Sequence, residues 1–191
     1  ARADRADEAD RPGLISADRH LERWVVHHRA GWLNGIFEGL SYAGRLGLLW
    51  LVLAAVLCAI YRRWGVLLLT FVSVALADWT AAALKALIDR PRPPLRYPEP
   101  KTLVPLPHDS SFPSGHAATS FAAATMLSFA FPAFAPVLVL LAAAVAFSRV
   151  YVGVHYPLDV IGGAALGALV AIALRQLLKD RLRLPRVRRG G

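Results

Sequence analysis

The stretch S-R-V-Y-V-G-V-H-Y-P-L-D, residues 148–159, lies between two long apolar segments and carries Arg149, His155 and Asp159. Charged groups at the edge of a bilayer are costly to place, so they usually serve a function. Pro157 is tolerated in the first turn of a helix, which predicts a helix start near His155. His155 and Asp159 then lie one turn apart on one helix face, where the carboxylate can orient the imidazole. The alternative is a helix N-terminus with a basic interfacial rim.

The composition indicates an integral membrane protein. The chain has 191 residues, of which 56% are hydrophobic, and its mean hydropathy is +0.45. These values are too apolar for an ordinary soluble protein of one domain. Seven of its 22 basic residues lie between Arg175 and Arg189, beside an apolar segment. This is the positive-inside pattern, so the net charge of +9 indicates anionic lipid and not nucleic acid as the partner. The high Ala, Leu and Arg content suggests a GC-rich bacterium and its cell membrane.

The apolar segments predict an all-α fold, an integral membrane helical bundle with about five transmembrane helices. A transmembrane helix needs about 20 mainly apolar residues, fewer where polar ends extend it. The predicted spans are residues 46–61, 66–88, 116–131, 134–147 and 156–178. A sixth crossing by the N-terminal segment is the alternative.

The N-terminal segment, residues 18–42, is predicted to form an amphipathic helix in the membrane interface, with Asp18 as its N-cap. Its apolar residues recur at helical spacing, but Arg and His residues interrupt them, so it is too polar to span. A packed amphipathic helix without lipid contact is the alternative. We therefore divide the chain into a polar tail at 1–17, a membrane-embedded domain at 18–180 and a basic tail at 181–191.

Residues 89–115 form the long polar connection, whose eight prolines stiffen it and exclude a helix. If the basic tail and Arg62–Arg63 face the cytoplasm, this connection and the one at 149–155 lie on the extracytoplasmic side. Gly163 and Gly167 form a G-x-x-x-G motif, which favours packing within the bundle, with a homo-oligomer interface as the alternative.

Three clusters of polar residues share this outer face. They supply three cations, a hydroxyl group and two histidines: Lys85, Arg92, Arg149, Ser114, His116 and His155. Gly115 lets backbone N–H groups approach an anion closely at a helix N-terminus. Such a set suits phosphoryl transfer, in which negative charge on the phosphoryl oxygens must be neutralised. The sequence offers no acidic cluster for Mg²⁺ or Zn²⁺, so we predict a site without metal or cofactor.

The three clusters resemble the motifs of the type 2 phosphatidic acid phosphatase family, which shares its site with vanadium haloperoxidases and glucose-6-phosphatase. The matching patterns are Lys85-x6-Arg92-Pro93, Pro113-Ser114-Gly115-His116 and Ser148-Arg149-x5-His155-x3-Asp159. Each motif alone is moderately specific, but all three occur in order at the ends of predicted spans. Family members often have six spans, which leaves the role of the N-terminal helix open.

The resemblance implies a role for each matching residue. His155 would attack phosphorus and form a phosphohistidine, and Asp159 would orient it. His116 would protonate the leaving oxygen and then activate water. The phosphate oxygens would be held by Lys85, Arg92, Ser114, Gly115 and Arg149. Arg90 competes with Arg92, but the family spacing favours Arg92, and seven residues along a helix returns to the face of Lys85.

Other ionisable residues receive weaker interpretations. Asp78 lies within a predicted span and either tunes Lys85 or makes a buried polar contact in the bundle. The remaining histidines have no partner at catalytic spacing and are interpreted as interfacial or loop residues: His20, His27, His28 and His108.

We therefore predict a membrane lipid phosphatase that acts on a lipid phosphate or diphosphate, with the polyprenyl class favoured by family analogy. The enzymatic alternatives are a phosphatidylglycerophosphate or phosphatidic acid phosphatase and a lipid phosphotransferase. The non-enzymatic alternative is a membrane scaffold. A transporter is disfavoured because the charged residues cluster at one face and not at mid-membrane.

Overall fold

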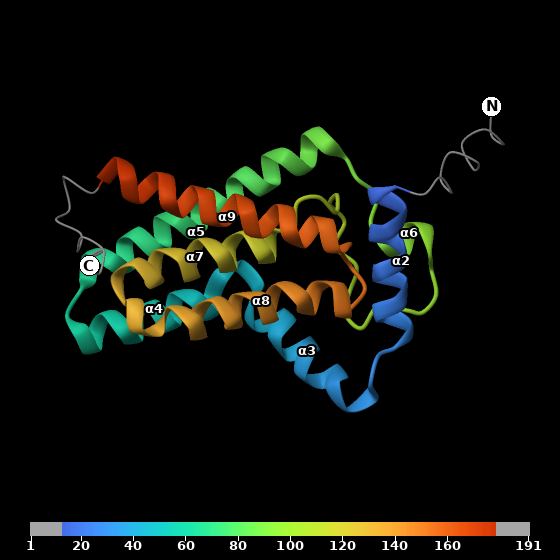
Figure 1. The fold of residues 1–191 in the computed structure, drawn as a ribbon, viewed down its shortest axis with the longest axis horizontal. Coiled ribbons are helices and arrows are strands. Elements are labelled where there is room, and N and C mark those ends of the chain that lie inside the picture. The colour runs from blue at the N-terminus through green and yellow to red at the C-terminus, as the bar shows by residue number, and fades with distance from the viewer. Residues whose placement is uncertain (1–12, 179–191) are drawn as a thin grey trace.

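The computed structural model describes residues 13–178, and this part of the chain is a bundle of helices without a strand (Figure 1). The predicted tails at 1–17 and 181–191 lie largely outside the described residues. The α-helices are α2 (Leu14–His27), α3 (Gly31–Ala43), α4 (Leu48–Tyr61), α5 (Trp64–Ile88), α6 (Pro93–Arg96), α7 (Gly115–Ala130), α8 (Ala135–Tyr151) and α9 (Pro157–Leu178). Short 3-10 turns, η2 and η3, occupy Arg45–Gly47 and Pro132–Phe134.

Helix α7 forms the centre of the bundle, because α5, α8 and α9 all pack against it. Its small Ala, Ser and Thr side chains allow this close approach, and ten of its sixteen residues are buried. Trp50 of α4 is fully buried and donates its indole N–H to Ser120 Oγ of α7 at 2.9 Å. The bundle therefore holds the start of α7 rigidly between its neighbours.

The G-x-x-x-G motif packs α9 directly on α7. A Cβ atom at Gly163 would overlap the backbone oxygen of Ser114. At Gly167 it would overlap the backbone oxygen of Ala118. These positions leave no room for any side chain, so both glycines serve close packing within the bundle.

Within residues 13–178, three helical segments are long and apolar enough to cross a membrane: Trp64–Arg96, Pro132–Tyr151 and Pro157–Leu178. The pair α3 and α4, bent by 72°, would make a fourth. The predicted count of about five spans also included α4 and α7 singly, which have 14 and 16 residues. At 1.5 Å per residue each is shorter than the hydrocarbon layer of about 30 Å.

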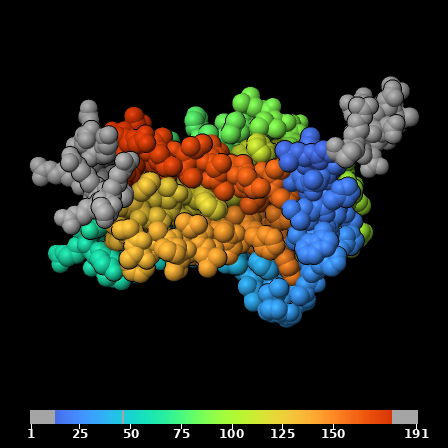
Figure 2. Space-filling view, viewed as in Figure 1, coloured from blue at the N-terminus to red at the C-terminus, as the bar shows by residue number. Residues whose placement is uncertain are grey.

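The prediction of one N-terminal helix from Asp18 to Tyr42 is wrong in two respects. Helix α2 begins at Leu14 with Gly13 as its N-cap. The helix is interrupted at residues 28–30, and α3 begins after this interruption. Asp18 lies inside α2 and is buried, whereas Leu14 and Trp24 are exposed. Figure 2 shows α2 lying against α9 and α8 at one end of the bundle.

Two further local predictions are corrected by the structure. The proline-rich connection contains one helical turn, α6. Pro93 and Pro94 occupy its first turn, where a backbone N–H has no partner within the helix, so the missing N–H of proline costs nothing. Helix α5 ends at Ile88, and Asp89 adopts a left-handed conformation with φ 47°. Arg92 therefore does not lie on the helical face of Lys85, and helix register does not select it over Arg90.

Candidate active site

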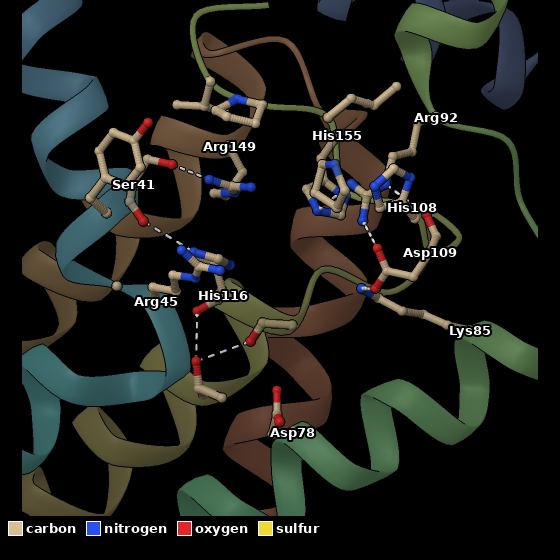
Figure 3. A pocket seen from close by; sticks show the side chains of 18 residues that line it. Ser41, Arg45, Asp78, Lys85, Arg92, His108, Asp109, His116, Arg149 and His155 are labelled. Atoms are coloured by element: carbon tan, nitrogen blue, oxygen red, sulfur yellow. Dashed lines mark hydrogen bonds and ion pairs between the residues drawn. The ribbon is translucent and has the colours of Figure 1, made fainter.

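A pocket of about 440 Å³ lies where α5 and α8 end and α7 and α9 begin (Figure 3). These helix ends meet toward one end of the bundle (Figure 1). Six of the eight predicted site residues line it: Lys85, Arg92, Gly115, His116, Arg149 and His155. The other two, Ser114 and Asp159, are fully buried behind the lining. Residues far apart in the sequence thus meet at one concave site.

His155 precedes α9 and presents one ring nitrogen to each of two partners. Its Nδ1 lies 3.4 Å from Asp159 Oδ2, and its Nε2 lies 3.1 Å from Arg92 Nη1. A guanidinium group has only donors, so Nε2 accepts the hydrogen bond and Nδ1 carries the proton toward Asp159. Burial, together with the charges of Arg92 and Arg149, holds the pKa of His155 well below its usual value. The imidazole is therefore neutral at neutral pH, with a lone pair on Nε2.

Arg92 is 2% exposed and is fixed by several hydrogen bonds. Its Nη1 donates to the backbone oxygen of Val154 at 2.9 Å, and its Nε donates to that of Asp109 at 2.8 Å. Its Nη2 and the ammonium group of Lys85 both bind the Asp109 carboxylate. Partial burial alone would raise the pKa of Asp109, but the hydrogen bonds from Lys85 and Arg92 lower it to about 2. This carboxylate shows that the two cations together hold an anion.

The opposite wall is organised by Ser41 at the end of α3. Arg149 Nη1 donates to Ser41 Oγ, and His116 Nε2 lies 3.1 Å from the backbone oxygen of Ser41. Since a carbonyl only accepts, Nε2 of His116 carries a proton, and Nδ1 remains available to exchange a proton with a ligand. Arg149 is 5% exposed, and its Nε has no hydrogen-bond partner among residues 13–178. A buried guanidinium donor without a partner is costly, which favours an anionic ligand here.

The start of α7 contributes backbone groups to the pocket. Ser114 is the N-cap, and its hydroxyl oxygen accepts a hydrogen bond from the Ala117 N–H at 3.5 Å. The Ser114 side chain therefore supports the helix terminus and does not line the pocket, whereas Gly115 does. The partial positive charge of a helix N-terminus is thus directed at the site.

Arg90 and Arg92 take different positions. Arg92 lines the pocket, whereas Arg90 lies behind Asp159, with its Nη1 2.5 Å from Asp159 Oδ1. Its Nη2 lies 2.6 Å from Asp18 Oδ2 of α2. Of the two competing arginines, Arg92 is therefore the one that can reach a ligand.

Several lining residues were not predicted from the sequence. They come from the η2 turn, the 101–111 segment and α3, and they include Ser41, Arg45, His108 and Asp109. His108, which the sequence indicates as an interfacial or loop residue, lies in a loop and lines the pocket beside Asp109 (Figure 3). Asp78 is exposed at the pocket, 3.6 Å from where a Cβ of Gly115 would lie, so the buried-contact interpretation is wrong.

Comparison with known proteins assigns the chain to a family. The model of the PAP2 superfamily matches residues 66–183, well over half of the chain. The chain belongs to the PAP2 superfamily. It is 35% identical over 162 residues to decaprenylphosphoryl-5-phosphoribose phosphatase of Mycobacterium tuberculosis, covering 84% of this chain and 78% of the relative. It is 32% identical over 165 residues to undecaprenyl-diphosphatase of Sulfolobus acidocaldarius, covering 85% and 79%.

The fold agrees with a solved PAP2 structure. The transmembrane phosphatidylglycerolphosphate phosphatase of Bacillus subtilis superposes with a TM-score of 0.72 at 26% identity, over 96% of this chain and 93% of the other. The predicted family resemblance and the all-α membrane bundle are thereby confirmed. This PAP2 protein is a membrane-embedded hydrolase that acts on lipid phosphates, and the scaffold alternative is not supported.

Proposed function

We propose that this PAP2 protein removes phosphate from a polyprenyl phosphate or diphosphate through a phosphohistidine on His155, without a metal ion. The observation that carries the proposal is the position of His155, with Nδ1 toward Asp159 and Nε2 in a pocket lined by four cationic side chains, among them the predicted Lys85, Arg92 and Arg149. A neutral imidazole oriented by a carboxylate is a competent nucleophile.

In the first step, the Nε2 lone pair of His155 attacks phosphorus and the bond from phosphorus to the leaving oxygen breaks. His116 enters this step as an imidazolium, because the negative charge of the bound phosphate favours a second proton on Nδ1. It passes this Nδ1 proton to the leaving oxygen, so the lipid product leaves as an alcohol or a monophosphate. In the second step, His116 takes a proton from water as the water oxygen attacks phosphorus. The P–N bond breaks, inorganic phosphate leaves, and both histidines return to their starting states.

The charge on the transferring phosphoryl group is neutralised by protein cations in this proposal. Lys85 and Arg92 bind its oxygens in place of the Asp109 carboxylate, and Arg149 donates from its unpartnered Nε. The start of α7, at Gly115, adds backbone N–H donors. Ser114 supports these donors as the N-cap.

The polyprenyl class is favoured by the names of two relatives, decaprenylphosphoryl-5-phosphoribose phosphatase and undecaprenyl-diphosphatase. Phosphatidylglycerophosphate is the second candidate, because the superposed Bacillus subtilis structure is named for that substrate. Phosphatidic acid is a third candidate substrate, and transfer of the phosphate to a lipid acceptor is a second candidate reaction.

Measuring phosphate release from a panel of substrates tests which lipid class this protein prefers. The purified protein in detergent receives undecaprenyl diphosphate, undecaprenyl phosphate, phosphatidylglycerophosphate or phosphatidic acid, with and without EDTA. We expect the highest kcat/KM with a polyprenyl substrate, unchanged by EDTA. A higher value with phosphatidylglycerophosphate would overturn the substrate class, and loss in EDTA with recovery in Mg²⁺ would overturn the metal-free mechanism.

We propose further that the site faces the extracytoplasmic side. Exposed Arg62 and Arg63, and Arg175 in the last turn of α9, lie at the bundle end opposite the pocket, which favours that end as cytoplasmic (Figure 1). At the pocket end, basic residues such as Arg29 and Arg90 are held by backbone oxygens or carboxylates.

Cysteine labelling tests the orientation. In a Cys58→Ala background, a membrane-impermeant maleimide should label Leu95→Cys in α6, near the pocket, on intact cells. Gly65→Cys, where a Cβ meets nothing within 4 Å, is the matched control at the other end and should react only after permeabilisation. The reverse pattern would place the site in the cytoplasm.

A further inference from the structure

The guanidinium group of Arg90 lies between two buried carboxylates outside the pocket. Its Nη1 is 2.5 Å from Asp159 Oδ1 and its Nη2 is 2.6 Å from Asp18 Oδ2. The side chains of Asp159 and Asp18 are 0% and 1% exposed, and that of Arg90 is 19% exposed. The Arg90 guanidinium also lies 4.3 Å from the centre of the Tyr156 ring. These contacts fix the Arg90 guanidinium group, and none of them involves a pocket-lining residue.

Arg90 completes the hydrogen bonding of the Asp159 carboxylate. The other oxygen, Oδ2, accepts the Tyr156 N–H at 2.9 Å and lies 3.4 Å from His155 Nδ1. With Oδ1 bound to Arg90, the carboxylate cannot rotate away from the imidazole. A fully buried carboxylate without a cation is strongly unfavourable, so Arg90 also keeps Asp159 charged.

Asp18 performs two tasks from a distant part of the sequence. Its Oδ2 binds Arg90, and its Oδ1 accepts the Leu158 N–H at 2.8 Å, in the first turn of α9. The first N–H groups of a helix have no partner within the helix, so Asp18 caps α9 from another helix. Helix α2 therefore holds both Arg90 and the turn of α9 that carries Asp159.

We propose that Arg90 is a positioning residue of this phosphatase, anchored by Asp18, which holds Asp159 against His155 and couples the docking of α2 to phosphoryl transfer. The inference rests on the proposed role of His155 as the nucleophile. It gives the N-terminal helix, whose role the sequence left open, a function at the site. Arg90 does not touch substrate, so it acts on the rate of the chemical steps and not on binding.

The test compares Arg90→Gln, Arg90→Lys, Asp18→Asn and the Asp18→Asn, Arg90→Gln double variant, each purified in detergent. Rates are measured on the best substrate of the panel and divided by the concentration of folded protein, which gives the number of active sites. We expect Arg90→Gln to lower kcat about 10- to 100-fold, as for other residues that orient a reacting side chain from behind. Values of KM and vanadate inhibition should change less than about threefold, whereas Arg92→Gln should weaken vanadate inhibition.

The remaining variants separate positioning from folding. Arg90→Lys should recover part of the rate, because it keeps the charge but cannot span both carboxylates. As a single substitution, Asp18→Asn should lower kcat. In the Arg90→Gln background it should lower kcat little further, since both residues act through one network. Arg23→Gln is the matched control on α2, because Arg23 binds the Glu99 backbone oxygen and His27. It should retain wild-type kinetics.

Three outcomes would overturn the proposal. The first is an unchanged kcat per active site in Arg90→Gln together with a lower melting temperature. The second is a raised KM with an unchanged kcat in the same variant. The third is additive effects of Asp18→Asn and Arg90→Gln on kcat in the double variant. If Arg90→Gln does not fold, Arg90→Lys and Asp18→Asn give the same comparison. Activity retained by His155→Ala would instead remove the proposed mechanism, whatever the Arg90 variants show.

Discussion

Replacing His155 by alanine should lower phosphate release by at least about 10³-fold, because the nucleophile that forms the covalent intermediate is lost. The pocket would still bind the phosphoryl group through Lys85, Arg92 and Arg149, so a small residual rate by direct attack of water is expected. Rapid quenching with labelled substrate should show a phosphoenzyme in the wild type and none in the variant. The label should be stable in alkali and lost in acid, as expected for a P–N bond.

Two companion variants make the result specific to His155. His155→Gln keeps a polar side chain in a fully buried position and should be as inactive as His155→Ala. His20→Ala removes an exposed histidine of α2 and should behave as the wild type. Thermal unfolding of all three in detergent shows whether the bundle is intact. A phosphoenzyme in His155→Ala, or release at the wild-type rate, would make the nucleophile assignment wrong.

The sequence predicts contacts where the signal is local. His155 and Asp159 are four residues apart, and although His155 precedes α9, its Nδ1 lies 3.4 Å from the Asp159 carboxylate, as this short spacing predicts. The apolar segments likewise predict the bundle, since a backbone in lipid must satisfy its own hydrogen bonds and long apolar runs do so as helices. Gly163 and Gly167 predict close helix packing, and both approach the backbone of α7.

Contacts between distant segments could not be predicted, because spacing along one helix says nothing about them. Asp18 reaches α9 from α2, and Asp109 reaches Lys85 and Arg92 from an irregular segment. Arg92 lines the pocket, and only the family spacing points to it, since α5 ends before it. A single sequence without periodicity in the 89–114 region gives no geometric signal for such pairs.

Helix ends were also misjudged where a cap was ambiguous. Asp18 has the residue type preferred at an N-cap, yet it caps α9 in space and not the helix that contains it. The break at residues 28–30 carries no proline, so it could not be seen in the sequence. It allows α3 to turn back toward α8, which brings Ser41 to His116 and Arg149.

Substitution of His116 should have an effect that depends on the leaving group. The proposed acid donates its proton from Nδ1 while Nε2–H is held by the backbone oxygen of Ser41. Loss of a general acid typically costs about 10²- to 10⁴-fold, and the cost is greatest when the leaving oxygen is most basic. His116→Ala should therefore lose most activity on phosphatidic acid, less on a polyprenyl diphosphate and least in the first step with p-nitrophenyl phosphate.

The second step makes this prediction sharper. Hydrolysis of the phosphohistidine needs His116 as a base whatever the first substrate was, because the attacking water must lose a proton. With p-nitrophenyl phosphate, the variant should release about one nitrophenolate per site in a burst and then turn over slowly. The phosphoenzyme on His155 should accumulate to a level that the wild type does not reach.

His116→Gln is the matched variant, since its amide N–H can still donate toward Ser41 but cannot exchange a proton at the substrate. It should show the same dependence on the leaving group and the same burst as His116→Ala. If instead the glutamine variant recovers the wild-type rate, His116 acts only by holding Ser41 and α3 in place. An equal loss on all three substrates without a burst would likewise contradict proton transfer, because a positional defect slows every leaving group alike.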